Sequence, residues 1–312
     1  MDGSTTADRR YHVIFNERSG TAEAIGLTAG ALQDLFDQAG LSAVIDARSD
    51  VPIDERITAA MTSTADVIVA AGGDGTITAL AGAIAGTDKS LAILPLGTVN
   101  ALAKDLNIPL DIRQAVAALG AGQEQLIDVG EVNGRIFLHK VVVGVIPAVA
   151  AGREYIRGRR DFTAKLGFLR YFARRLARAR RMAVVIKTPD GTTRIERVQA
   201  MAVASNAYDE GLGQFFSRSS LDRGTLTLYT LRHLTLRDVL RLTAEMLLGT
   251  WRNDEALSIE SVDSVTIDTR KTLLKVMFDG EVETLHPPLE FSIRKQALSV
   301  LVQGADTVQE VA

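Results

Sequence analysis

Short β-branched runs that alternate with helical patterns over about the first 120 residues constrain the fold of this chain most. Four such runs, at residues 11–15, 42–46, 66–71 and 90–94, indicate strands. Segments between them, such as 21–39 and 53–62, carry apolar residues at three- and four-residue spacing, which is typical of helices. Strands and helices in this order build a parallel sheet covered by crossover helices. We therefore predict a Rossmann-like α/β domain at residues 1–128.

From about residue 126 the apolar period changes to two, and turn pairs such as Asn133-Gly134, Asp190-Gly191 and Asp279-Gly280 separate the alternating segments. These pairs are typical of turns between antiparallel strands. Helical patterns at residues 163–181 and 236–251 interrupt the series. We therefore predict a mostly antiparallel β-sandwich with helical insertions over residues 129–312, with a last strand or tail that can return to the first domain.

A glycine-rich turn directly follows the third predicted strand. Residues 72–76 read Gly-Gly-Asp-Gly-Thr and lead into a helical pattern at 77–84. At the carboxyl edge of a parallel sheet, glycines let the backbone approach a ligand, and the free amides of the next helix attract phosphate. The alternative is a tight turn without a ligand, but such a turn rarely needs three glycines with an acid and a hydroxyl. The dinucleotide fingerprint does not match, because Thr78 stands where it requires glycine.

Polar turns also follow the first and fourth predicted strands. Residues 16–21 read Asn-Glu-Arg-Ser-Gly-Thr, and residues 95–100 read Pro-Leu-Gly-Thr-Val-Asn before a helix at 101–106. The first turn alone is equally well explained by helix capping, since Asn, Ser and Thr are preferred cap residues. Three such turns at one sheet edge favour a polyphosphate site.

The three turns resemble those of the diacylglycerol kinase catalytic-domain family, which includes bacterial lipid kinases and sphingosine kinases. Residues 72–76 match its nucleotide loop in full. Residues 16–20 are similar to its Asn-Pro-x-Ser-Gly turn, with Glu17 in place of proline, and residues 95–100 to its Pro-x-Gly-Thr-x-Asn turn, with Ala101 after it in place of a common aspartate.

Motifs in the second half extend the resemblance to about residues 11–302. Ser205-Asn206 and Asp279-Gly280-Glu281 match family motifs. The nucleotide loop alone would also fit NAD kinases and some phosphofructokinases. The Asp-Gly-Glu motif, followed by residues 288–291 and a final strand, is similar to the lipid-kinase end of that superfamily.

The resemblance implies an ATP- and Mg²⁺-dependent lipid kinase that transfers the γ-phosphate to a lipid hydroxyl, with diacylglycerol as the favoured acceptor and phosphatidic acid as product. Alternatives are a sphingoid-base or other lipid kinase, an NAD kinase-like enzyme, and a catalytically weak nucleotide- or lipid-binding relative. The residues implied to bind ATP are Asn16, Ser19, Gly20, Gly72, Gly73, Asp74, Gly75, Thr76, Gly97, Thr98 and Asn100.

The resemblance also implies that Asp279 is the catalytic base, with Glu281 beside it. From the residues alone, Asp-Gly is favoured as a hairpin turn, and a turn and a base are compatible. Asp74 is the acid nearest to a magnesium ion on the nucleotide, since Mg²⁺ prefers carboxylate and phosphate oxygens. Relatives have a structural magnesium site to which Asp222 would contribute, although Arg223 brings a positive charge there.

A basic segment suggests how the chain would reach a lipid. Residues 153–181 contain ten arginines and one lysine against two acids, and apolar residues alternate with the basic ones at helical spacing. We predict peripheral contact with anionic membrane through Lys165 to Arg181; the alternative is a helix that packs on the sheet and solvates its arginines. No base-reading motif suggests nucleic acid. A monomer and a homodimer are both compatible with the sequence.

Several features that the sequence lacks limit where we expect the protein to be located and how it can bind a metal. There is no cysteine, and the four histidines are scattered without metal-ligand spacing. The first ten residues have no apolar run typical of a secretory signal. The longest apolar stretch, at residues 141–151, is too short for a spanning helix. We therefore expect a cytoplasmic protein, with a peripheral position on the inner face of the membrane.

Overall fold

The computed structural model describes residues 9–144, 181–210, 217–233 and 235–304 and divides the chain into two compact units. The first unit holds the described residues up to Val129 together with those from Gln296 onward. The second unit runs from Gly130 to Lys295. The basic segment from Lys165 to Arg181, apart from Arg181 itself, lies outside the described residues.

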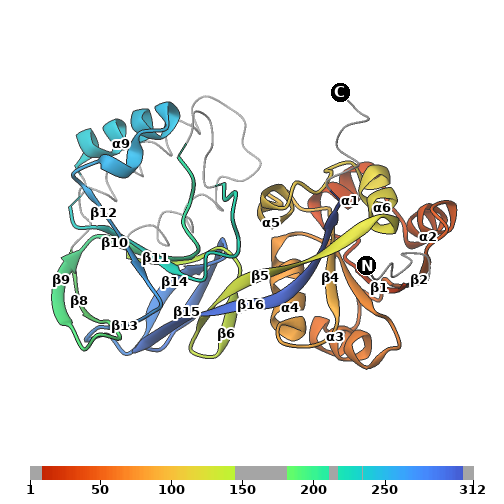
Figure 1. Cartoon of the computed structure of the whole chain (residues 1–312), viewed down its shortest axis with the longest axis horizontal. Helices are drawn as coiled ribbons and strands as arrows, with labels where there is room; N and C mark the ends of the chain where they lie inside the picture. The colour runs from red at the N-terminus through yellow and green to blue at the C-terminus, as the bar shows by residue number, and fades with distance from the viewer. Residues whose placement is uncertain (1–8, 145–180, 211–216, 234, 305–312) are drawn as a thin grey trace, which may run out of the picture. The chain divides into compact units, whose positions relative to one another are not determined.

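A parallel sheet forms the centre of the first unit (Figure 1). Its strands are β1 (Arg10–Phe15), β2 (Ser42–Asp46), β3 (Val67–Gly72) and β4 (Ser90–Pro95), in the order β2-β1-β3-β4. Every residue of β3 and β4 is buried, as expected for the apolar central strands of a sheet covered on both faces. The last part of β16 (Leu289–Gln303) adds a further parallel strand beside β4.

Six helices accompany this sheet. They are α1 (Gly20–Ile25), α2 (Ala29–Gln38), α3 (Ile53–Thr62), α4 (Asp74–Ile84), α5 (Ala101–Asp105) and α6 (Ile112–Gly120). The prediction of one helix over residues 21–39 is wrong, because Gly26 ends α1 with φ of 65°. The hydroxyl of Thr28 then accepts the N–H of Ala31 and starts α2 as a new helix.

The second unit is a β-sandwich. One layer is antiparallel, in the order β12 (Leu257–Val262), β11 (Leu226–Leu231), β10 (Ala200–Ser205), β7 (Lys140–Gly144), β14 (Leu274–Phe278) and β15 (Glu281–Leu285). The other contains the first part of β16 with β13 (Ser264–Asp268), β8 (Met182–Lys187) and β9 (Thr193–Val198), and β5 (Gly122–Val132) pairs there with β6 (Arg135–Phe137). Residues of both layers, such as Val203 and Ile267, share one buried cluster, so the predicted fold class is confirmed.

The hairpins of this unit follow the predicted turn pairs. Asn133 and Gly134 join β5 to β6 with φ of 49° and 79°, and Asp279 and Gly280 join β14 to β15 with φ of 46° and 100°. Two positive φ angles match the twist of the flanking strands. The predicted helix at 236–251 is shorter in the structure, since α9 spans Leu236–Leu248 and a 3₁₀ turn follows at Trp251–Asn253.

Candidate functional site

The three polar turns predicted from the sequence lie in contact at one edge of the first unit's sheet; we call residues 16–21, 72–76 and 95–101 the turn site. The turns follow β1, β3 and β4, and β3 pairs in parallel with both of the other strands. Thr21 joins the first turn to the third, because its backbone N–H donates to Leu96 O at 3.0 Å and its hydroxyl to Gly97 O at 2.9 Å. Parallel strands therefore bring distant segments together as predicted.

Asp74 joins the second turn to the third. Its carboxylate accepts the backbone N–H of Asn100 at 3.0 Å and that of Ala101 at 2.7 Å, at the start of α5. Asn100 in turn shapes its own turn, since its side-chain oxygen accepts Gly97 N–H at 2.8 Å and its amide donates to Gly97 O at 3.0 Å. Both side chains therefore hold the turns in place, with Asp74 half-buried and Asn100 buried.

Two glycines of the turn site lie so close to neighbouring atoms that an added Cβ atom would displace those neighbours. A Cβ atom on Gly97 would lie 2.6 Å from Gly73 Cα and 2.7 Å from Asn100 Oδ1. A Cβ atom on Gly72 would lie 2.7 Å from Thr76 Oγ1. A side chain at Gly97 would push the third turn away from the second, so this glycine brings the two backbones into contact, whereas a side chain at Gly72 would displace Thr76 within the second turn.

The turn site offers unused donors. The hydroxyl of Ser19, which stands at the N-cap of α1, is buried and has no hydrogen-bond partner among the described residues. Helix α4 begins after Gly73, which has no side chain to cap it, and the first amides of a helix lack acceptors within the helix. A buried hydroxyl and free helix amides suit a bound anion, because leaving such donors without partners costs free energy.

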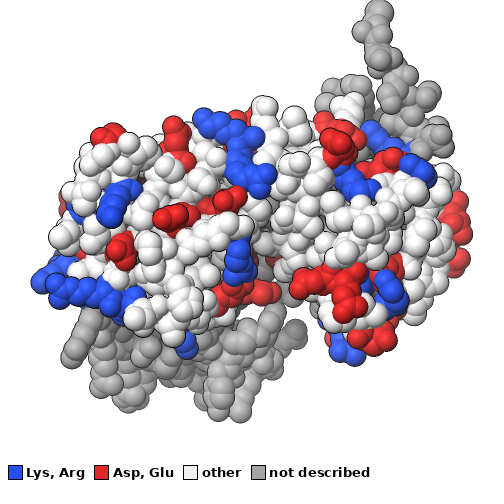
Figure 2. All heavy atoms as spheres, turned by 90° about the horizontal axis from the view of Figure 1, so that it is seen from below, with Lys and Arg blue, Asp and Glu red and all other residues white. Residues whose placement is uncertain are grey.

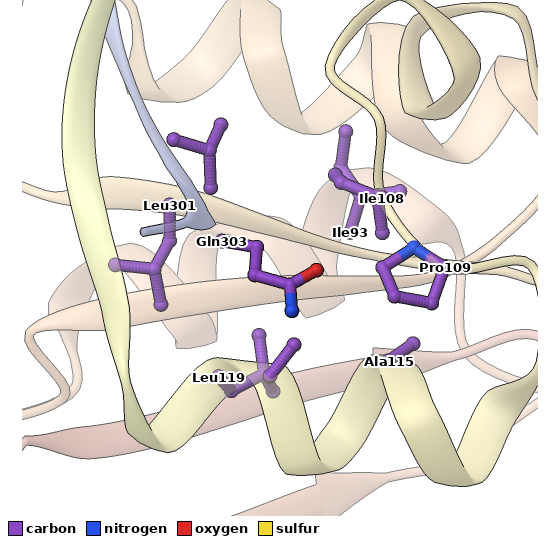
Figure 3. A pocket seen from close by; sticks show the side chains of 9 residues that line it. Ile93, Ile108, Pro109, Ala115, Leu119, Leu301 and Gln303 are labelled. Atoms are coloured by element: carbon purple, nitrogen blue, oxygen red, sulfur yellow. The ribbon is translucent and has the colours of Figure 1, made fainter. Parts of the chain in front are cut away.

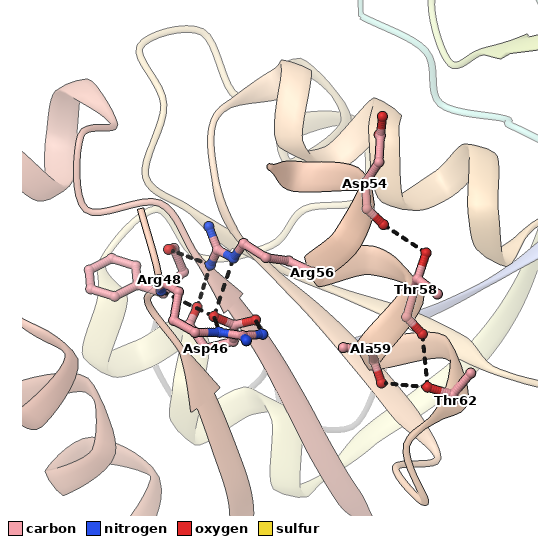
Figure 4. Close-up of polar contacts among 8 residues, drawn as sticks. Asp46, Arg48, Asp54, Arg56, Thr58, Ala59 and Thr62 are labelled. Atoms are coloured by element: carbon pink, nitrogen blue, oxygen red, sulfur yellow. Dashed lines mark hydrogen bonds and ion pairs between the residues drawn. The ribbon is translucent and has the colours of Figure 1, made fainter. Parts of the chain in front are cut away.

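An ion-pair network around the buried Asp46 carboxylate supports the first turn (Figure 4). Arg56 of α3 donates from Nη2 to Phe15 O, the residue before Asn16, at 2.9 Å, and its Nε lies 3.3 Å from Asp46 Oδ1. Arg48 binds the other oxygen of the same carboxylate at 2.8 Å. Burial alone would raise the pKa of Asp46, but the hydrogen bonds from Arg48 and the charges of Arg56 and Arg48 outweigh it and lower the pKa to about 2.

Asp279 of the second unit lies at the tip of the β14–β15 hairpin and binds a bend between β6 and β7. Its carboxylate accepts the backbone N–H groups of Leu138 at 2.7 Å, His139 at 2.8 Å and Lys140 at 3.0 Å. Its own N–H donates to Lys140 O at 3.0 Å. Asp279 is half-buried, whereas Glu281 opens β15 and is exposed.

Three ionisable groups around this bend have shifted pKa values. Burial raises the pKa of Asp279, while the three backbone hydrogen bonds and the charge of Arg218 act against that rise. Burial lowers the pKa of Lys140 to about 8, with Arg218 acting in the same direction and Asp279 against it. Burial also holds the pKa of His139 well below its usual value, so the imidazole is neutral at pH 7. Raised carboxylate pKa values suit general bases.

A small cavity in the first unit carries no ligand site. Figure 3 shows the amide of Gln303 among apolar side chains that include Ile108, Pro109 and Leu119. The volume of about 10 Å³ admits at most one water molecule. The turn site and the Asp279 region therefore remain the candidates for chemistry.

Comparison with known families covers both units. A model described as "Diacylglycerol kinase catalytic domain" matches residues 10–132, and one described as "YegS C-terminal NAD kinase beta sandwich-like domain" matches residues 141–302, more than half of the chain. The chain belongs to the family of diacylglycerol kinases and related lipid kinases. It is thus a phosphotransferase with an alcohol group as acceptor, as predicted, and membership in a kinase family implies ATP as donor.

One relative of this lipid kinase matches most of its length, and another matches a shorter part at higher identity. The diacylglycerol kinase of Bacillus subtilis is 27% identical over 290 residues, which cover 89% of this chain and 92% of the relative. A probable lipid kinase YegS-like protein of Pseudomonas syringae pv. tomato is 42% identical over 86 residues, 27% of this chain and 28% of the relative. The solved structure of a putative diacylglycerol kinase from Bacillus anthracis shares the fold, with a TM-score of 0.71, 20% identity and coverage of 97% and 100% of the two chains.

Of the two acids predicted to bind magnesium, Asp74 suits the ion better than Asp222. Within the described ranges, no three carboxylate, imidazole or thiol side chains gather in a cluster that would hold a metal. Asp74 keeps further lone pairs on its oxygens, and Mg²⁺ is commonly held by one carboxylate together with substrate phosphates. Asp222 is exposed and accepts the hydroxyl of Ser220 at 2.7 Å, while its neighbour Arg223 pairs with Asp209 at 3.3 Å. These contacts do not suit a structural magnesium site at Asp222.

The described surface of the lipid kinase carries charges of both signs. Figure 2 shows basic and acidic side chains interspersed over one face, and exposed pairs such as Arg135 with Glu283 at 2.6 Å combine them. Among the described helices, none combines the length and apolar character needed to cross a bilayer. The predicted membrane contact, apart from Arg181, falls on residues outside those described.

Residues that sequence reasoning missed lie mainly around the Asp279 bend and below the first turn. Arg218, His139 and Lys140 follow no motif or spacing in the sequence, and neither do Arg48 and Arg56. Besides the Asp-Gly-Glu motif itself, the matched pair Ser205-Asn206 pointed near the bend, since Ser205 N–H donates to His139 O at 3.0 Å.

Proposed function

We propose that the chain transfers the γ-phosphoryl group of ATP to the free hydroxyl of diacylglycerol, which yields phosphatidic acid and ADP. The observation that carries this proposal is the turn site, where three turns are tied together and the buried Ser19 hydroxyl has no partner in the part of the chain that the structure describes. The name of the Bacillus subtilis relative, which aligns with nearly the whole chain, supports diacylglycerol as the acceptor.

The turn site would bind the phosphates of ATP through donors that it already presents. The Ser19 hydroxyl and the first amides of α4, from Asp74 to Thr76, would donate to phosphate oxygens. Asn16, Gly20 and Thr98 complete the proposed set at the same three turns. The contacts of Asp74 and Asn100 would keep the amides fixed, which favours transfer because donors that are already oriented need no rearrangement.

Asp279 would act as the general base. As the lipid hydroxyl oxygen forms a bond to the γ-phosphorus, the bond from that phosphorus to the β-γ bridging oxygen breaks and ADP leaves. The hydroxyl proton passes to the Asp279 carboxylate, whose pKa is raised by burial and which therefore accepts a proton more readily than an ordinary aspartate. Glu281, two residues further on, would add negative charge beside the base.

Magnesium would neutralise charge on the phosphate oxygens when it is bound, with Asp74 as the protein carboxylate nearest to them. The role of the chain is to fix Asp74, which it does through the amides of Asn100 and Ala101.

We further propose that residues from Lys165 to Arg181 bring the enzyme to anionic lipid on the inner face of the membrane. Each basic residue near an anionic surface contributes about 1 kcal/mol to binding. Replacing Arg174, Arg175 and Arg178 with glutamine should weaken sedimentation with vesicles that contain phosphatidylserine. Equal binding of the unaltered chain to anionic and neutral vesicles would reject this part of the proposal.

The test of the whole proposal is ADP release from ATP and Mg²⁺ in mixed micelles. We expect release with diacylglycerol and labelled phosphatidic acid as product. Faster turnover with a sphingoid base would identify that base, in place of diacylglycerol, as the acceptor. Turnover on NAD without lipid would favour an NAD kinase. If calorimetry detects no binding of ATP with Mg²⁺, the proposed turn site is wrong.

A further inference from the structure

The bend at residues 138–140 is held from two directions. From one, the Asp279 carboxylate accepts all three of its N–H groups, at 2.7–3.0 Å. From the other, the guanidinium of Arg218 donates to Leu138 O at 2.7 Å and lies 3.0 Å from His139 Nδ1. These two side chains come from distant segments of the chain, and both bind this three-residue bend.

Arg218 also ties the bend to the neighbouring strand. Its Nη1 donates to Ser205 O, at the end of β10, at 2.9 Å, and Ser205 N–H donates to His139 O at 3.0 Å. One guanidinium thus joins the bend before β7 to the end of β10. The planar fork of arginine can reach several acceptors with fixed geometry, which the single ammonium of lysine cannot reproduce.

The burial of Arg218 indicates that its charge and its donors are both needed. The residue is 2% exposed, although burial of a guanidinium costs several kcal/mol unless acceptors are fixed around it. An apolar side chain would fill the same space at lower cost. Among the described residues, the acceptors of Arg218 include the bend and its strand neighbour, and its positive charge also acts on Asp279.

We propose that Arg218 is a positioning residue for the base: it fixes the bend at 138–140, and through the three amides of that bend it fixes the Asp279 carboxylate. This inference rests on the proposed function, in which Asp279 is the base. A carboxylate held by three oriented amides keeps one direction toward its substrate, and loss of about 1 Å of precision at a reacting group can cost roughly 100-fold in rate.

The test compares Arg218→Lys and Arg218→Gln with the unaltered full-length chain. We expect both variants to lower kcat by roughly 10- to 100-fold while the KM for ATP changes by less than about twofold. Arg218→Gln should also move the acidic limb of the kcat profile to higher pH, since it removes a cation near Asp279, and Arg218→Lys should move that limb less. Arg197→Gln, which alters an exposed arginine of the same unit, is the matched control and should behave as the unaltered chain.

Hydrogen–deuterium exchange provides a readout that does not need activity. In the unaltered chain the amides of residues 138–140 should exchange as slowly as those inside β7, and in Arg218→Lys they should exchange faster. Fast exchange of these amides in the unaltered chain would overturn the inference even if no variant folds. So would a folded Arg218→Lys protein with unchanged exchange and unchanged kcat. Absence of lipid-dependent ADP release from the unaltered chain would instead reject the proposed function, and exchange would still decide the role of Arg218.

Discussion

The turn site of the first unit and the Asp279 region of the second are assembled in different ways. Each turn of the first is a short continuous segment after a strand, and the parallel sheet brings the three together. The second gathers single residues, Asp279, Arg218 and the bend at 138–140, from segments far apart in the chain. Local motifs are therefore sufficient to locate a site built from backbone turns, whereas a network of side chains depends on the packing of the whole unit.

The turn site and the Asp279 region also differ in the role of their charged groups. In the turn site, the acid Asp74 accepts the backbone N–H groups of Asn100 and Ala101, and the first amides of α4 are the donors proposed for a ligand. In the Asp279 region, burial shifts the pKa of the carboxylate upward and that of Lys140 downward to about 8, as expected where charges lie in protein rather than in water. The first region is thus suited to holding an anion, and the second to exchanging a proton.

The largest effect should follow from removing the base. Asp279→Asn should lower kcat by roughly 100- to 10,000-fold, since a general base contributes that much, and leave calorimetric ATP binding nearly unchanged. Steady-state ADP release with lipid measures the first and calorimetry the second. Asp263→Asn, at an exposed aspartate of the same unit, is the control. Retained turnover in a folded Asp279→Asn protein would show that Asp279 is not the base, and that the turn site and the Asp279 region do not have the separate roles proposed for them.

The second-largest effect should follow from a substitution that forces the second and third turns apart. Gly97→Ala places a Cβ atom 2.6 Å from Gly73 Cα, and the overlap should lower the free energy of unfolding by about 1–3 kcal/mol and weaken ATP binding by about tenfold or more. Urea unfolding and calorimetry measure these effects. Gly82→Ala, inside α4 with open space around the added Cβ, should instead leave binding intact and raise stability by about 0.5–1 kcal/mol. Similar behaviour of the two variants would contradict the close approach.

The ion pairs below the first turn should make stability depend on pH. Because the pKa of Asp46 is lowered from 3.8 to about 2, its stabilisation of about 2 kcal/mol is complete above pH 4 and is lost as the pH falls toward 2. Asp46→Asn should therefore be less stable than the unaltered chain at pH 7, and the difference should shrink below pH 4. Urea unfolding at several pH values tests this, with Asp34→Asn, at an exposed aspartate of the same unit, as control. A difference that is independent of pH would show that the network does not depend on the Asp46 charge.

The smallest effect should come from the unpartnered hydroxyl. Ser19→Ala should weaken ATP binding by roughly 10-fold, since one hydrogen bond to a charged group, worth about 1.5 kcal/mol, is lost. Stability without nucleotide should stay the same or rise, because no internal hydrogen bond is broken. Calorimetry and thermal unfolding measure the pair of effects, and Ser42→Ala, at an exposed serine of β2, should change neither. A loss of stability with unchanged ATP binding would assign Ser19 to the fold and not to the ligand.

Sequence by itself determined the two-part α/β and β-sandwich fold, the three turns and the family, because these depend on apolar period and on glycine, cap and turn residues that act over a few neighbours. It could not separate α1 from α2, since the left-handed Gly26 and the Thr28 cap fall inside an unbroken apolar pattern. Only the tertiary structure decided that Arg56 would support the first turn and that Arg218 would face the bend next to Asp279. The contacts of a buried arginine are set by which backbone carbonyls and charges packing leaves within its reach, and such partners have no fixed spacing along the chain.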